Sequence, residues 1–75
     1  MNTYTTSNQI VRARIDAEAE SLYNQFMNII NSNQQAQNKR KLNYIFEYHS
    51  ELVANGVNAR TIIDNQEMSK HIDSI

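Results

Sequence analysis

The stretch ANGVNARTIIDN, residues 54–65, contains the only glycine of the chain, Gly56. Glycine adopts a left-handed backbone conformation without steric cost, so it commonly follows the last residue of a helix. Asn58, two residues later, has a side chain suited to capping the start of a new helix. We therefore interpret this stretch as a capped boundary between two helices.

Apolar side chains recur at helical spacing on both sides of this boundary. Upstream, in NSNQQAQNKRK (residues 31–41), Ser32 is followed three residues later by Gln35, which is the pattern of a capping box. We therefore expect a short turn at about residues 31–33, a helix over about 33–55 and a further helix over about 59–72. The expected inward residues are Leu42, Ile45, His49 and Leu52 in the first of these helices, and Ile62, Ile63, Met68 and Ile72 in the second.

A longer amphipathic helix is expected over about residues 7–31, after a flexible segment at residues 1–6. Thr6 and Gln9 form a second capping-box pattern at its start. Its apolar stripe alternates four and three residues apart, as a buried helical face requires. The stripe consists of Ile15, Ala19, Leu22, Phe26 and Ile29.

These elements predict an all-α fold, an antiparallel helical hairpin with a shorter third helix, in a single small domain over residues 1–75. Residues of the two hairpin helices whose numbers sum to about 64 lie at similar heights, because the turn is centred near residue 32. This register brings Arg12 and Arg14 level with Glu47 and Glu51. A chain of 75 residues has a thin core, so we expect self-association to complete the fold.

Composition excludes several classes of protein. The chain has no cysteine, which excludes a disulfide framework, and no apolar stretch approaches the length of a membrane span. We find no secretory h-region at the N-terminus and expect a cytoplasmic protein. The formal net charge of -1 provides no overall attraction for nucleic acid. Frequent asparagine, isoleucine, lysine and tyrosine suit an A/T-rich genome such as that of a phage or mobile element.

The sequence offers no catalytic constellation. His49 and Ser50 are adjacent, which places their side chains about 100° apart on a helix and unsuited to act as base and nucleophile. Asp16 and Glu20 share a helix face without the histidine that a helical carboxylate metal site needs. His49 and His71 lie on different predicted helices without further zinc ligands. We therefore expect no enzyme, no cofactor and no metal site.

Two features point to a binding surface instead. Lys39, Arg40 and Lys41 form the one basic cluster, near the start of a predicted helix, where free N–H groups favour a phosphate or an acidic surface. Tyr44 and Tyr48 lie four residues apart on a flank outside the apolar seam, where aromatic side chains anchor protein partners. A second copy of the chain and a foreign protein are equally compatible with these tyrosines.

The stretch LVANGVNARTIIDN also resembles the turn of a helix-turn-helix motif, with a glycine, a small apolar residue, a polar N-cap and a following helix. The resemblance implies base contacts from Asn58, Ala59, Arg60 and Asp64 at the start of that helix. The chain departs from the motif because its preceding helix is much longer and its second helix is acidic. That helix carries Asp64, Glu67 and Asp73 against Arg60 and Lys70.

The favoured interpretation is a non-enzymatic, self-associating helical protein that regulates or inhibits a partner protein, of phage or mobile-element origin. One alternative is a helix-turn-helix-like DNA-binding regulator that uses Asn58, Arg60 and Asp64. The other alternative is a binder of a small phosphate-bearing ligand at the basic tip of the hairpin.

Overall fold

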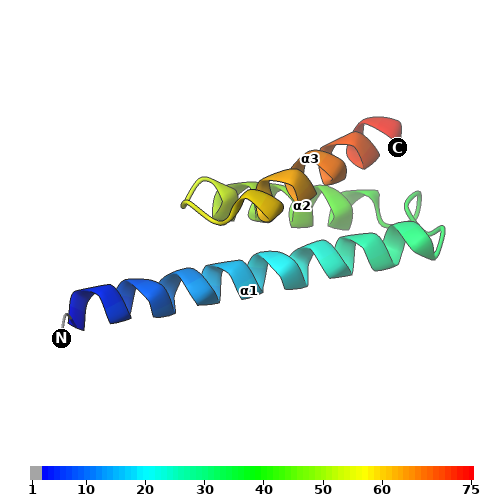
Figure 1. The fold of residues 1–75 in the computed structure, drawn as a ribbon. Helices are drawn as coiled ribbons and strands as arrows, with labels where there is room; N and C mark the ends of the chain where they lie inside the picture. Colours follow the sequence, from blue (N-terminus) through cyan, green and yellow to red (C-terminus); the bar gives the residue numbers. More distant parts are fainter. Residues whose placement is uncertain (1–2) are drawn as a thin grey trace.

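A computed structural model describes the backbone of residues 3–75 and the side chains of residues 11–75. Within these residues the chain forms three helices and no strand, α1 (Thr3–Asn31), α2 (Lys39–Val53) and α3 (Ala59–Ser74). Figure 1 shows that the chain runs along α1, returns along α2 and then turns again into α3. Each helix contacts the other two, in a molecule of 51 × 16 × 16 Å. The expected all-α class is confirmed.

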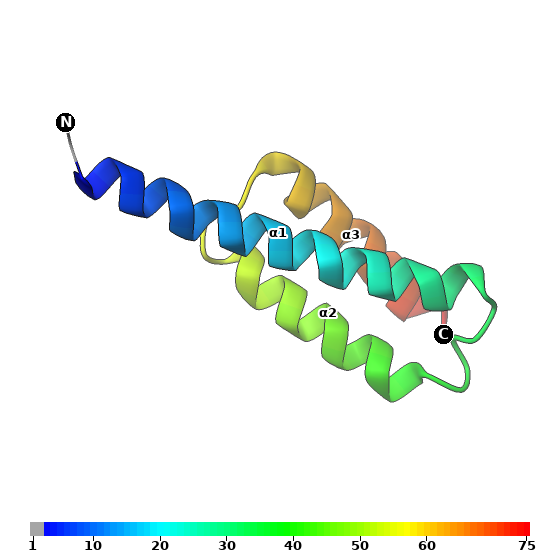
Figure 2. The same ribbon diagram turned by 90° about the horizontal axis from the view of Figure 1, so that it is seen from below.

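α1 is much longer than the helices that pack on it. Figure 2 shows its N-terminal part extending past the loop between α2 and α3. Residues 11–14 are accordingly all exposed, including Arg12 and Arg14, so ion pairs from these arginines to Glu47 and Glu51 on the exposed side of α2 would add little stability. None of the three helices, within residues 3–75, combines the length and apolar character that a membrane crossing demands.

α1 begins earlier than the sequence predicts. It includes residues 3–6 of the segment expected to be flexible, and residues 1–2 lie outside the described part of the chain. Thr6 therefore lies inside α1 and cannot be its N-cap, so the predicted capping box with Gln9 is wrong.

α2 begins later than the sequence predicts, at Lys39 instead of residue 33. Asn33 adopts a left-handed backbone conformation with φ of 60° and ends α1. The amide of Asn33 donates to the carbonyl of Ile30, and the amide of Gln34 donates to the carbonyl of Ile29, each at 3.1 Å. This pair of bonds is a Schellman ending, so Ser32 belongs to the close of α1 and does not cap α2. Residues 34–38 form turns, because only Ala36 among them offers apolar surface to bury.

The boundary at residues 54–58 agrees with the sequence. Gly56 has a φ of 82°, and its amide donates to the carbonyl of Val53 at 3.2 Å. Asn58 is the N-cap of α3, and its Oδ1 accepts from the amide and the hydroxyl of Thr61, both at 3.0 Å. The left-handed glycine and the capping asparagine therefore turn the chain from α2 into α3.

The core is a cluster to which all three helices contribute. Phe26 from α1, Leu42 and Ile45 from α2 and Met68 from α3 are at most 4% exposed. Partly buried apolar side chains surround this cluster, and Ala19 of α1 is also fully buried. The surrounding residues are Leu22, Tyr23, Met27, Ile29, Ile30, Phe46, Ile72 and Ile75.

The predicted inward face of α3 is wrong at two positions. Ile62 is 42% exposed and Ile63 is 62% exposed, whereas Thr61 is buried. The inward face follows the spacing of residues 61, 65, 68 and 72, because Asn65 donates hydrogen bonds to side chains of α2. Polar contacts therefore set the rotation of α3 and leave two isoleucines in solvent.

The core assignment predicts a clear contrast between two isoleucines. Ile45→Ala should lower the free energy of unfolding by about 2–5 kcal/mol, because it leaves a cavity in the central cluster. Ile63→Ala, at an exposed position of α3, should change it by less than about 0.5 kcal/mol. Denaturant titration followed by circular dichroism measures both. A cost below about 1 kcal/mol for Ile45→Ala would contradict the assignment.

Candidate functional site: the outer face of α2

α2 turns one side to the solvent, opposite the side that carries Leu42, Ile45 and His49. The solvent side joins charged and aromatic residues that are three or four apart along the helix and therefore neighbours on its surface. We call this surface the outer α2 face. It consists of Arg40, Lys41, Tyr44, Glu47, Tyr48 and Glu51, all exposed.

The charges of this face are separated along the helix. Arg40 and Lys41 lie in the first turn, next to the exposed Lys39, while Glu47 and Glu51 lie toward the C-terminal end. The tyrosines lie between them, with Tyr44 71% and Tyr48 38% exposed.

A hollow of about 270 Å³ is lined by Tyr44, Glu47, Tyr48 and Glu51. The expected binding residues are therefore divided, because the two tyrosines lie with carboxylates and the basic cluster lies outside this hollow.

Glu18 of α1 belongs to the same neighbourhood, although no local sequence pattern indicates it. The hydroxyl of Tyr48 donates to Oε1 of Glu18 at 2.6 Å. This hydrogen bond and the negative charge of Glu18 raise the pKa of the Tyr48 hydroxyl above its ordinary value. The contact pairs residues whose numbers sum to 66, close to the sum of about 64 expected from the turn. The expected register could therefore have indicated that Glu18 lies near Tyr48.

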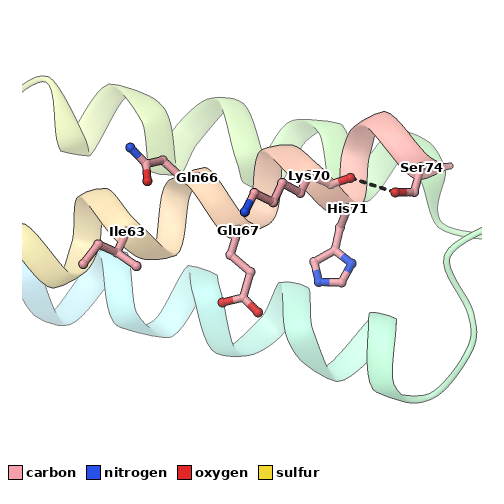
Figure 3. A pocket seen from close by; sticks show the side chains of 6 residues that line it. All are labelled: Ile63, Gln66, Glu67, Lys70, His71 and Ser74. Carbon is pink, nitrogen blue, oxygen red and sulfur yellow. Dashed lines mark hydrogen bonds between the residues drawn. The ribbon is translucent and has the colours of Figure 1, made fainter.

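α3 carries a second hollow, of about 500 Å³, shown in Figure 3. Figure 3 shows Glu67 and His71 pointing toward α1, where the hydroxyl of Tyr23 donates to Glu67 Oε2 at 2.7 Å. That hydrogen bond, together with burial and the negative charge of Glu67, raises the pKa of Tyr23 to about 12. The hydroxyl of Ser74 donates to the carbonyl of Lys70 at 2.9 Å, so its proton is held by the backbone and not by a base. Ile63 and Gln66 complete the lining.

His49 is fully buried between α2 and α3. Asn65 Nδ2 lies 2.9 Å from His49 Nδ1 and donates to it in the ring tautomer that leaves Nδ1 unprotonated. The same amide nitrogen of Asn65 donates to Ser50 Oγ at 3.0 Å, and the Ser50 hydroxyl donates to the carbonyl of Phe46 at 2.8 Å. His49 and Ser50 therefore share Asn65 as a partner and form no base and nucleophile pair with each other.

The residues selected for DNA contact lie in acidic surroundings. Asn58, Arg60 and Asp64 line a hollow of about 180 Å³ together with Thr61 and the carboxylates of Asp16 and Glu20 from α1. The side-chain oxygen of Asn58 is occupied by the cap of α3. The carboxylates that share this hollow with Arg60 repel a phosphate backbone, whose contacts dominate DNA affinity.

No protein-family model, no curated protein and no solved structure matches this chain. Among the described residues, no three histidine, cysteine, aspartate or glutamate side chains are grouped so that they could hold a metal ion. The outer α2 face combines two exposed tyrosines with opposite charges toward its two ends.

Burial of His49 predicts that the folded state becomes less stable as the pH is lowered. Burial lowers the pKa of His49 below its ordinary value of 6.5, and the charge of Asp64 offsets part of this effect. The unfolded chain then binds a proton more readily than the folded chain. The contribution of neutral His49 to the free energy of unfolding is therefore complete above about pH 6.5 and is lost as the pH falls toward the pKa of His49 in the folded state.

We expect the melting temperature of the protein to drop between about pH 7 and pH 5. His49→Gln should remove most of this drop, and His71→Gln, which changes the partly buried histidine of α3, should retain it. Thermal melts at closely spaced pH values measure the slope. An unchanged slope in His49→Gln would show that other groups cause the drop.

Proposed function

We propose that the protein is a non-enzymatic helical interaction protein that regulates or inhibits a protein partner bound at the outer α2 face. In this proposal it is a cytoplasmic protein of phage or mobile-element origin. Its antiparallel hairpin of α1 and α2, with α3 packed against them, is completed by self-association.

The observation that carries the proposal is the exposure of Tyr44. Its side chain is 71% exposed on an ordered helix, which leaves a large aromatic ring in water. Tyrosine is enriched among the residues that dominate binding energy at protein interfaces, because the ring supplies apolar area and the hydroxyl supplies a hydrogen bond. Tyr48, held by Glu18, gives the same surface a second aromatic group with a fixed orientation.

The charges around the tyrosines support a protein partner more strongly than nucleic acid. The hollow beside the rings is lined by Glu47 and Glu51, and Glu18 lies against Tyr48. Three carboxylates next to the stacking surface repel phosphate groups, whereas they suit the mixed charges of a protein surface.

The test is capture of the partner by tagged protein from a lysate of the native host, with and without nuclease. A protein that co-purifies after nuclease treatment should bind Tyr44→Ala about thirtyfold more weakly, the cost of removing an interface hot spot of about 2 kcal/mol. Ile63→Ala, which removes an exposed apolar side chain of α3, is the matched control and should bind as the wild type does.

Equal capture by Tyr44→Ala and the wild type would refute the outer α2 face as the binding surface. Recovery of nucleic acid alone would favour the DNA-binding alternative, and Arg60→Ala would then be the next variant to measure.

A further inference from the structure

The outer α2 face is electrostatically complementary to itself. Its N-terminal end carries Arg40 and Lys41, and its C-terminal end carries Glu47 and Glu51. A two-fold axis perpendicular to α2 reverses the direction of the helix, so it brings the basic end of one copy to the acidic end of the other. The macrodipoles of the two helices are also antiparallel in such a pair, which favours the arrangement.

The positions around the helix agree with this pairing. At 100° per residue, Arg40, Glu47 and Glu51 lie on one side of Tyr44, and Lys41 and Tyr48 lie on the other. About a two-fold axis, each side meets the same side of the second copy. If residues whose numbers sum to about 90 are opposite each other, Arg40 reaches the carboxylates of Glu47 and Glu51 in the second copy.

The other side of the face pairs equally well. In the same register Lys41 lies opposite Tyr48 of the second copy, whose hydroxyl is hydrogen-bonded to Glu18 at 2.6 Å. An ammonium group in that position contacts the aromatic ring and the nearby carboxylate. Both cations of one copy thereby meet acidic or aromatic groups of the other.

The centre of the face offers shape as well as charge. The ring of Tyr44 projects into solvent, and a hollow of about 270 Å³ lies beside it, between Tyr48 and the two glutamates. Under the two-fold rotation, Tyr44 of each copy comes to the hollow of the other, since it lies close to the axis. A projecting ring and an adjacent hollow are the features that self-complementary interfaces combine.

We propose that a second copy of this chain occupies the outer α2 face until the partner displaces it, in an antiparallel dimer whose two-fold axis passes near Tyr44. This inference rests on the proposed function only in using the same surface. The dimer buries both tyrosines of each copy, on the side of α2 opposite the core.

Two charge-reversal variants test the pairing. Variant A carries Arg40→Glu and Lys41→Glu, and variant B carries Glu47→Lys and Glu51→Lys. In variant A the face carries only negative charges, and in variant B it carries only positive charges, so each variant repels itself while A and B attract each other. Lys70→Glu and Asp73→Lys are controls for the charge changes, at exposed positions of α3.

Sedimentation velocity and native mass spectrometry measure the outcome, with circular dichroism to verify the fold. We expect a dimer for the wild type and both controls, at least a tenfold weaker dimer for A and for B, and a one-to-one heterodimer when A and B are mixed. A monomeric wild type, or dimers of A and B as tight as the wild type, would overturn the pairing.

A covalent probe gives an independent test, because the chain has no cysteine. Under mild oxidation, Tyr44→Cys should form a disulfide-linked dimer and Ile63→Cys should not, because only residue 44 lies near the proposed axis. Equal cross-linking of the two variants would refute the axis.

The two proposals fail separately. A monomeric wild type that still captures a foreign protein through Tyr44 would disprove the dimer and leave the proposed function intact. A dimer disrupted in A and B, together with unchanged capture of the foreign protein by Tyr44→Ala, would disprove binding of that partner at this face and leave the dimer intact.

Discussion

The packing of Phe26, Leu42, Ile45 and Met68 is the contact on which the rest of the molecule depends. All three helices contribute to this cluster, so no helix can leave without exposing the others. The chain is too short to build a second core. Positions beyond the cluster therefore rely on specific polar contacts, such as those of Asn65 with the buried His49 and with Ser50.

The sequence predicts helices and inward positions where the apolar pattern is regular, and it fails where polar contacts decide. The stripe through Ala19 and Phe26 and the boundary at Gly56 follow from spacing and backbone preference. The rotation of α3 does not, since Asn65 faces α2 and hydrogen-bonds to His49 and Ser50, whereas Ile62 and Ile63 face outward. The sequence predicts the start of α2 too early, because Ser32 and Gln35 match a capping-box pattern although Ser32 belongs to the end of α1.

The candidate site shows the same division between local and long-range information. Its residue types and their exposure follow from helical periodicity, since Tyr44 and Tyr48 lie off the apolar seam. Their surroundings do not, because Glu18, which accepts a hydrogen bond from Tyr48, lies 30 positions away in the chain. The two tyrosines follow a basic cluster in the sequence, but the fold surrounds them with carboxylates. This acidic environment suits a protein partner better than a nucleic acid.

Gly56 carries a consequence for the unfolded chain. A Cβ built at this position would meet no other atom within 4 Å. Glycine is therefore favoured here by its left-handed backbone conformation, with φ of 82°, and not by a lack of space. A D-amino acid prefers that region of backbone space, as an L-residue prefers its mirror image. D-alanine introduced by chemical synthesis should therefore adopt this backbone conformation and stabilise the protein by about 0.4–1 kcal/mol, by reducing the conformational freedom of the unfolded state. At Gly56, the L-configuration of ordinary residues, and not the packing around the site, thus prevents a more stable substitution.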